Sequence, residues 1–373
     1  MTRSARVTKR AFALGAISAA AVLMLSACGS SSSSSAPASG GNNATAYTAQ
    51  QVPIGDSKKI TVTGPIHMAY LAARGNAYLS MVEQTVKSEA AKYPGATVDV
   101  FDSGFDGQKQ LQQVQNAITS GKYNAFFVNS IGSEGLLCKS LTEDAPAANI
   151  AVVNVASPLC AGLPLKPHPA DHYAPGTLAI IDNASVDFYV AWYNWVISKN
   201  PGPQKVIMME GPESHTNSAI QNAALAIVTK DHPEFQIIAT GHTDWSRVQG
   251  QSVMANLLTA HPDVTIVQGV YSDITLGALT AIKRAGVQDN IKVYDRGGSS
   301  DILAAIKAGA VQATTLNYAQ GSAITAWSIF QKAFTGQPFP NVVLNEGGPV
   351  EAGSTTGLTP IDSSNVNQTE PQF

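Results

Sequence analysis

Residues 96–129 read ATVDVFDSGFDGQKQLQQVQNAITSGKYNAFFVN. This stretch opens with a short run rich in β-branched residues, continues with a polar stretch of helical length and closes with the apolar run NAFFVN. In the middle part, Leu111, Val114 and Ile118 recur at intervals of three and four, which predicts one buried helix face. The order strand, helix, strand is typical of a βαβ unit in a parallel sheet.

The same alternation continues on both sides of this unit, and a second series starts after a proline-rich break. Two such series predict an α/β protein with two doubly wound parallel-sheet lobes joined by a hinge. A ligand is then expected between the lobes, at the carboxyl ends of the strands. The expected strands are 59–64, 96–101, 124–129, 150–155, 177–181, 205–210, 235–240, 263–269, 291–295 and 311–316, and the expected helices are 76–93, 107–121, 133–144, 184–199, 217–231, 246–260, 273–285 and 300–308.

The N-terminal residues carry the pattern of a bacterial export signal. Four basic residues within the first ten precede an uncharged apolar run, 11–25, which is short for a membrane-spanning helix. The sequence Leu25-Ser26-Ala27-Cys28 then matches the lipobox of bacterial lipoproteins, in which Cys28 is lipidated and becomes the first residue after cleavage. The alternative is an ordinary signal peptide with an incidental cysteine.

The segment after Cys28 is mostly Ser, Ala, Gly and Asn, a composition that buries too little apolar surface to fold. We therefore expect a lipoprotein signal at 1–27 and a flexible tether at 28–57. Removing the signal's four basic residues from 23 leaves 19 basic against 26 acidic side chains, a formal net charge of −7. This balance argues against a nucleic-acid partner.

Two segments, 102–129 and 244–280, resemble a known family. The second reads DWSRVQGQSVMANLLTAHPDVTIVQGVYSDITLGALT and combines a helix, an HPDV loop, a strand and a characteristic helix start. Over residues 58–345 the chain resembles the sugar-type solute-binding proteins of ABC transporters, the ribose/galactose/xylose branch of the type I periplasmic binding proteins. The resemblance implies a monomeric, hinged receptor without cofactor or metal that captures a small polar ligand, expected to be a sugar, and delivers it to an ABC permease and its ATPase. It places 58–181 and 318–343 in the N-terminal lobe, and 182–317 and 344–373 in the C-terminal lobe.

The resemblance also implies ligand-binding residues, position by position. At the start of the first helix Asn76 and Tyr78 match the family, whereas Leu79 stands where the family has a second aromatic residue. The other expected ligand-binding residues are Asn129, Asn217, Ser272, Asp273, Asp295, Arg296 and Asn317. The alternatives are structural: Asn76, Asn217 and Ser272 as helix N-caps, Asp102 as a turn residue, Asp295 with Arg296 as an ion pair, and Tyr78, Trp245 and Tyr271 as core residues.

Two departures leave the ligand open. The family's Asp-Arg pair after the fourth strand is Ala156-Ser157 here. An arginine at the start of the second lobe's second helix is also missing, and the sequence offers Glu210, His215, Asn217 and Gln221 there instead. A non-sugar ligand such as a nucleoside, a polyol or a furanone signal is therefore the alternative.

Cys138 and Cys160 remain as an even pair in an exported chain, which predicts a disulfide, with two buried free thiols as the alternative. The nearby loop 156–177 contains His168, Asp171 and His172, a spacing that a metal site could use. Its prolines argue against a regular helix there, so we expect a surface loop pinned by the disulfide near the cleft.

Catalytic motifs are missing from the sequence. It contains no G-x-S-x-G, H-E-x-x-H or G-x-x-x-x-G-K pattern. We therefore expect a binding protein and not an enzyme. The rival role is that of a sensor that presents its ligand-bound form to a chemoreceptor or a sensor kinase.

Overall fold

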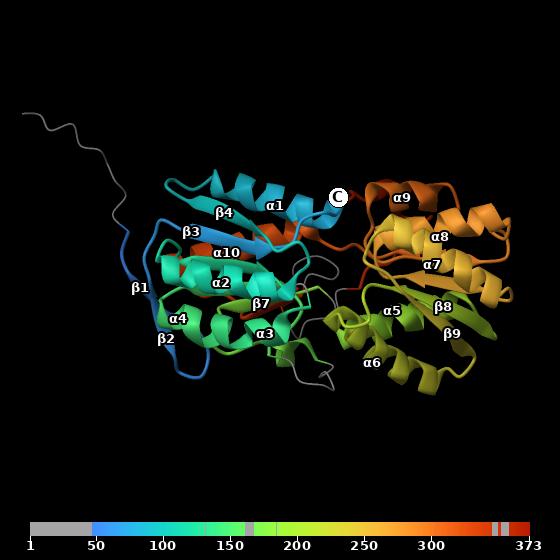
Figure 1. The fold of residues 1–373 in the computed structure, drawn as a ribbon, viewed down its shortest axis with the longest axis horizontal. Helices are drawn as coiled ribbons and strands as arrows, with labels where there is room; N and C mark the ends of the chain where they lie inside the picture. Colours follow the sequence, from blue (N-terminus) through green and yellow to red (C-terminus); the bar gives the residue numbers. More distant parts are fainter. Residues whose placement is uncertain (1–46, 131, 161–167, 184, 345–349, 352–357) are drawn as a thin grey trace, which may run out of the picture. The chain divides into compact units, whose positions relative to one another are not determined.

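Two parallel sheets, each covered by helices, organise the chain in the computed structural model (Figure 1). The structure describes residues 47–130, 132–160, 168–183, 185–344, 350–351 and 358–373, all within one structural unit. The expected signal, Cys28 and most of the expected tether lie outside these residues. None of the described helices is long and apolar enough to cross a membrane.

The first lobe is built on a seven-stranded sheet with the order β14-β13-β7-β6-β5-β3-β4, parallel except for β14. Successive residues of β3 face opposite sides: Met68 and Tyr70 pack with α1 and α10, whereas Leu71 packs with α2 and α3. The strands are β3 (His67–Ala72), β4 (Thr97–Asp102), β5 (Ala125–Asn129), β6 (Ala151–Ala156), β7 (Ala179–Asp182), β13 (Val342–Leu344) and β14 (Val350–Glu351). The helices are α1 (Ala77–Ala90), α2 (Gly107–Ser120), α3 (Glu134–Lys139), which continues through a π-helical turn (Ser140–Asp144) into α4 (Ala145–Ala147), and α10 (Ala319–Phe334).

The second lobe is built on a six-stranded sheet with the order β15-β12-β11-β10-β8-β9, parallel except for β15. Its inner strands follow the same rule: Ile207 and Met209 pack with α7 to α9, and Val206 and Met208 pack with α5 and α6. The strands are β8 (Gln204–Glu210), β9 (Phe235–His242), β10 (Ile266–Gly269), β11 (Lys292–Tyr294), β12 (Ala313–Thr314) and β15 (Ile361–Asp362). The helices are α5 (Val186–Lys199), α6 (Thr216–Asp231), α7 (Arg247–Ala260), α8 (Ser272–Ala285), α9 (Ser300–Lys307) and the short 3₁₀ turn Val366–Gln368.

The chain passes between the lobes more than once, which is the expected hinge arrangement. It leaves the first sheet after β7 and enters the second lobe through α5, and it returns after β12 through α10 and β13. Figure 1 shows α10, in orange-red, beside the blue strands of the first sheet although it follows the second lobe in sequence. The Trp327 indole of α10 donates a hydrogen bond to the carbonyl of Val86 in α1 (2.9 Å), which ties the returning helix to the first lobe.

The first parallel strand differs from the sequence prediction. The predicted strand 59–64 is observed as β2 (Lys59–Val62), but it pairs only with β1 (Gln50–Pro53) in a separate two-stranded sheet. The strand that occupies this place in the main sheet is β3, HMAYLA, which the prediction missed. Its residues are mostly Ala, Met, Leu and His, so tertiary burial and not β-propensity makes it a strand.

The domain boundaries also differ at two points. The strand β1 lies within the segment expected to be a flexible tether, because its pairing with β2 extends the folded part toward the N-terminus. The strand β14, expected in the C-terminal lobe, pairs antiparallel with β13 in the first sheet.

One helix face is rotated relative to the prediction. In α2 the buried residues are Gln110, Val114 and Ala117, while Leu111 and Ile118 are half-buried. The Gln110 amide donates to main-chain carbonyls of β3 and β5, and these bonds let a polar side chain occupy the buried stripe.

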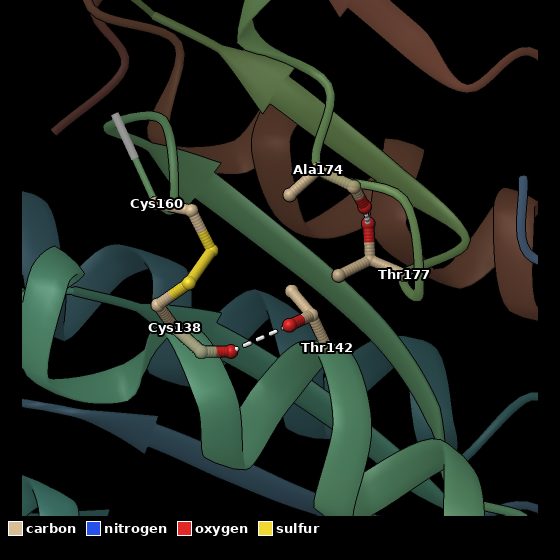
Figure 2. Close-up of a disulfide and its surroundings, with 5 residues drawn as sticks. All are labelled: Cys138, Thr142, Cys160, Ala174 and Thr177. Carbon is tan, nitrogen blue, oxygen red and sulfur yellow. Dashed lines mark hydrogen bonds between the residues drawn. A yellow bond between two sulfur atoms is a disulfide. The ribbon is translucent and has the colours of Figure 1, made fainter. Parts of the chain in front are cut away.

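Cys138 and Cys160 form a disulfide, as predicted (Figure 2). The bond joins α3 to the segment that follows β6. The Thr142 hydroxyl, one helical turn after Cys138, donates to the carbonyl of Cys138 (2.8 Å). This side-chain hydrogen bond stabilises the helical turn that carries the cysteine.

Candidate functional site

A cavity of about 110 Å³ lies where the carboxyl ends of the strands of both sheets meet. Its walls are amides, hydroxyls and aromatic rings, with few aliphatic side chains. From the first lobe come Asn76, Tyr78, Leu79, Phe105, Asn129, Ser130, Ala156 and Ser157; the segments between the lobes supply Asn183 and Asn317; and the second lobe supplies His215, Asn217, Trp245, Val270, Tyr271 and Arg296.

Six of the nine predicted ligand-binding residues line this cavity: Asn76, Tyr78, Asn129, Asn217, Arg296 and Asn317. The Asn129 side chain, 5% exposed, makes no hydrogen bond to another described side chain or backbone group, so its amide is available to a ligand. Ala156 and Ser157, which replace the family's charged pair, also form part of the wall and leave it uncharged at this point.

The other three predicted residues do not line the cavity. Asp295 is fully buried, and its carboxylate accepts hydrogen bonds from the hydroxyls of Thr275 (2.5 Å) and Thr314 (2.7 Å) within the second lobe. The backbone N–H of Gly298 (3.2 Å) and the Ser272 hydroxyl (3.4 Å) complete the set. Burial raises the pKa of Asp295, and these four donors oppose that effect by stabilising the charged form. Asp295 therefore holds the second lobe together and makes no ion pair with Arg296.

Ser272 and Asp273 begin α8, and Ser272 is part of this network. Besides its contact with Asp295, the Ser272 hydroxyl accepts a hydrogen bond from the backbone N–H of Ser299 (3.2 Å). Asp273 pairs with Arg247 on the surface (3.2 Å). The alternative that Ser272 is an N-cap is wrong, since Tyr271 precedes the helix and Ser272 is its first residue.

The remaining structural alternatives have different outcomes. Asn76 is both an N-cap, accepting from the backbone N–H of Leu79 (2.8 Å), and a cavity residue. Asn217 is not a cap, because the His215 ring occupies that place and accepts from the Asn217 N–H (3.1 Å). Asp102 is a turn residue, since its carboxylate accepts from the N–H of Gly104 (2.9 Å).

The segments between the lobes add a hydrogen-bonded group that the sequence prediction missed. The Asn183 amide donates to the hydroxyl of Tyr78 (2.7 Å) and to the side-chain oxygen of Asn317 (3.3 Å). Asn183 follows β7 directly and Asn317 lies shortly after β12, so the network joins both chain crossings to the first helix. A polar residue two positions after the predicted strand 177–181 was the available signal.

Behind Asn217, a second group of side chains fixes its orientation. The Gln221 amide donates to the Asn217 side-chain oxygen (2.7 Å), and the Tyr189 hydroxyl donates to the same oxygen (3.3 Å). Gln221 itself is fully buried and lies outside the cavity wall. The residues offered in place of the missing arginine therefore have different roles. His215 and Asn217 face the cavity, and Gln221 supports Asn217.

Aromatic rings from both lobes surround the cavity, and Trp245 and Tyr271 are part of the wall as well as packed on other rings. The Trp245 ring lies edge-on to His215, with ring centroids 5.1 Å apart, and edge-on to Tyr271, at 6.1 Å. The ring of Phe373 lies against both Tyr78 (6.0 Å) in the first lobe and Tyr271 (6.1 Å) in the second.

Three of the cavity residues have left-handed backbone conformations although they are not glycine. The φ angles are +62° at Phe105, +79° at Ala156 and +70° at Trp245. Such residues cost about 1–3 kcal/mol each and persist where the surrounding structure requires them. Three such residues in one cavity wall indicate that the surrounding packing holds the backbone in a conformation that these residues disfavour. Such strained backbone is common in ligand sites.

The two histidines of the loop 156–177 each contact a carboxylate. The His168 ring contacts Asp187 (3.0 Å), and the buried His172 ring contacts Asp182 (2.6 Å) at the end of β7. In the part of the chain that the structure describes, no three His, Cys, Asp or Glu side chains are grouped to hold a metal ion. Residues 161–167 of this loop lie outside the described part.

Glu210, at the end of β8, is fully buried, and neither carboxylate oxygen has a hydrogen-bond partner among the described residues. Burial raises the pKa of this carboxyl to about 7, although His242, 3.8 Å away, opposes the shift. The folded-state pKa of Glu210 is above the unfolded value, so the unfolded chain loses this proton first as the pH rises. The free energy of unfolding therefore has its full value below about pH 4.5, falls as the pH rises, and has lost this contribution above pH 7.

Glu210→Gln is therefore expected to stabilise the protein at pH 8 by about 3 kcal/mol relative to the unsubstituted chain, with little difference at pH 4.5. Urea unfolding at both pH values measures this. Glu213→Gln, at an exposed neighbouring position, is the control and should not change the dependence on pH. An unchanged pH dependence in Glu210→Gln would show that another group is responsible.

The geometry defines a class: a two-lobed α/β protein with a polar cavity at the strand ends between the lobes. The model of the periplasmic binding protein domain family matches residues 66–338. This chain belongs to that family, and its relatives confirm the resemblance to the sugar-type branch. Members of this family are solute-binding proteins.

Two sets of relatives support this assignment. The chain is 26% identical to the ribose import binding protein of Escherichia coli over 239 residues, which cover 64% of this chain and 74% of the relative. It is 32% identical to the D-apiose import binding protein of Actinobacillus succinogenes over 125 residues, 33% of this chain and 37% of that one. A solute-binding protein of Bacillus halodurans with bound myo-inositol has the same fold, with a TM-score of 0.68, 18% identity, and coverage of 82% of this chain and 97% of the other.

Proposed function

We propose that this protein is an extracytoplasmic receptor that captures one small polar molecule, a sugar or a close relative of a sugar, and delivers it to an ABC permease and its ATPase. The observation that carries the proposal is the cavity lined by five asparagines and by aromatic rings from both lobes. Asparagine side chains donate and accept hydrogen bonds, which suits hydroxyl groups, and aromatic rings suit the apolar faces of a sugar. Closure of two lobes around such a ligand excludes water and strengthens these bonds.

The N-terminal pattern supports a proposed location. We propose that a lipid on Cys28 anchors the chain to the outer face of the cell membrane, and that the serine-rich tether lets the lobes reach the permease. We propose that the protein acts as a monomer, as the resemblance to the family suggests. The permease and its ATPase are partners that membership of the family suggests.

Thermal unfolding with a panel of pentoses, hexoses, sugar acids, polyols and nucleosides tests the proposal. At least one compound should raise the unfolding temperature in a concentration-dependent way, because a ligand that binds only the folded state stabilises it. The compound class that gives the response separates sugars from the nucleoside and polyol alternatives. A flat response over the whole panel would contradict the proposed function.

With a responding compound in hand, Asn129→Ala should weaken its binding about five- to tenfold, because one hydrogen bond to the ligand is lost. The free energy of unfolding should change little, since the amide makes no hydrogen bond to described residues. Asn116→Ala, at an exposed position on α2, is the matched control and should bind normally. Unchanged affinity in Asn129→Ala would place the ligand elsewhere.

A further inference from the structure

Arg296 brings a positive charge into the cavity wall. It lies two residues after β11, its side chain is buried, and it faces the cavity. One terminal nitrogen, Nη2, donates to the backbone carbonyl of Asn183 between the lobes. The Nε–H of the same guanidinium has no hydrogen-bond partner among the described residues.

Aromatic rings cover one side of this guanidinium. Its central carbon lies 5.4 Å from the ring centroid of Phe188 and 5.7 Å from that of Tyr189, both on α5. The two rings fix the guanidinium in place and exclude water from one side of it. In such a low-dielectric site, an opposite charge is attracted far more strongly than in water.

A counter-ion for Arg296 is missing from the described part of the chain. No carboxylate there lies within ion-pair distance of the guanidinium, and the adjacent Asp295 is occupied by hydroxyls of its own lobe. The described cavity wall contains no Asp or Glu. Burial lowers the pKa of His215, and the nearby Glu134 carboxylate opposes that shift, so the histidine of the wall favours its neutral form. Arg296 is therefore the charged side chain among the described residues of the wall.

Two helices add to this potential. The N-termini of α1 and α6 lie at the cavity, where Asn76 and His215 cap them and form part of the wall. The N-terminal end of a helix carries a partial positive charge. A buried guanidinium without a counter-ion is costly, so an occupant with a negative group would relieve that cost.

We propose that the ligand is a sugar acid, a monosaccharide or polyol whose carboxylate lies against the Arg296 guanidinium. This inference rests on the proposed function and narrows it. The five asparagines and two serines of the wall then bind the hydroxyl groups. A carboxylate carries one charge, which matches the single guanidinium, whereas a phosphate ester carries up to two. Carboxylate and guanidinium are also both planar and can form paired hydrogen bonds.

Matched compounds test the inference on the unsubstituted protein. Calorimetric titration would compare galactose with galacturonate and galactose 6-phosphate, glucose with glucuronate, and ribose with ribonate. In at least one set the acid should bind at least tenfold more tightly than the neutral sugar, and its affinity should fall as salt is added. Equal or tighter binding of the neutral sugar in every set, or a preference for the phosphate, would overturn the sugar-acid inference and leave the proposed function standing. Failure of every carbohydrate to bind would overturn both.

A substitution ties the preference to one residue. Arg296→Gln removes the charge and retains an amide donor, so the ratio of acid to neutral affinity should fall at least tenfold, while Arg296→Lys should retain part of it. Arg247→Gln, which removes an exposed arginine of the same lobe, should leave the ratio unchanged. An undiminished acid preference in folded Arg296→Gln would overturn the assignment. If that variant does not fold, the acid-to-neutral ratio and its salt dependence in the unsubstituted protein decide the matter.

Discussion

Asp295→Ala is expected to lower the free energy of unfolding by about 3 kcal/mol, because it leaves buried donors without an acceptor. The carboxylate binds two threonine hydroxyls, a serine hydroxyl and a backbone N–H, which together join β11, β12 and α8. Urea unfolding at pH 7 measures the loss. Residual ligand affinity, measured on the folded fraction at low temperature, should stay close to that of the unsubstituted protein.

Asp273→Ala is the matched control for this experiment. Its carboxylate pairs with the half-exposed Arg247 on the surface, a contact worth less than about 1 kcal/mol. The two aspartates were both predicted ligand residues, so the comparison separates a structural role from an exposed ion pair. If the Asp295→Ala protein has normal stability and weakened ligand binding, the structural role is wrong and Asp295 is a ligand-binding residue.

Trp245→Ala is expected to weaken ligand binding at least tenfold, because it removes the largest aromatic face of the cavity wall. The ring is held in position by a close approach of backbone. A Cβ atom at Gly211 would lie 2.2 Å from the Trp245 ring, so only glycine leaves space for it. Calorimetric titration of the variant with the compound found by the thermal panel measures the effect.

Trp195→Ala serves as the control for the tryptophan. This partly buried residue of the same lobe stacks on Trp192, with ring centroids 5.3 Å apart, and does not line the cavity. It should reduce stability without changing affinity. Equal loss of affinity in both variants would indicate a general effect of destabilising the second lobe, and it would contradict a direct contact between Trp245 and the ligand.

The sequence predicted the α/β alternation well because parallel strands buried on both faces are continuous apolar runs, which few other structures require. AFFVN and VIMME are such runs, and both are strands. The strand β3 escaped because HMAYLA lacks β-branched residues, and the neighbouring KITVTG has them. A local pattern cannot show that β2 pairs outside the main sheet, because only tertiary contacts decide which of two adjacent strands enters it.

The site was predictable where it depends on strand ends and helix starts, as for Asn129 and Asn76. It was not predictable where the direction of a side chain decides whether a residue reaches the cavity. The two residues that follow β11 illustrate this, because their side chains point in different directions. Asp295 turns into its lobe while Arg296 faces the cavity, and a spacing of one residue does not distinguish them. Phe105 lies in a loop with a left-handed backbone, which no periodicity indicates.

The Cys138–Cys160 disulfide connects ligand recognition to the compartment in which the chain folds. Cys160 lies three residues after Ser157, a residue of the cavity wall, and the bond fixes this segment to the helix that starts at Glu134. A protein produced in a reducing cytosol would therefore have correct strands and helices but one unsupported wall. Preparations for ligand screening should come from oxidative secretion, and their free-thiol content should be measured before any compound is scored as inactive.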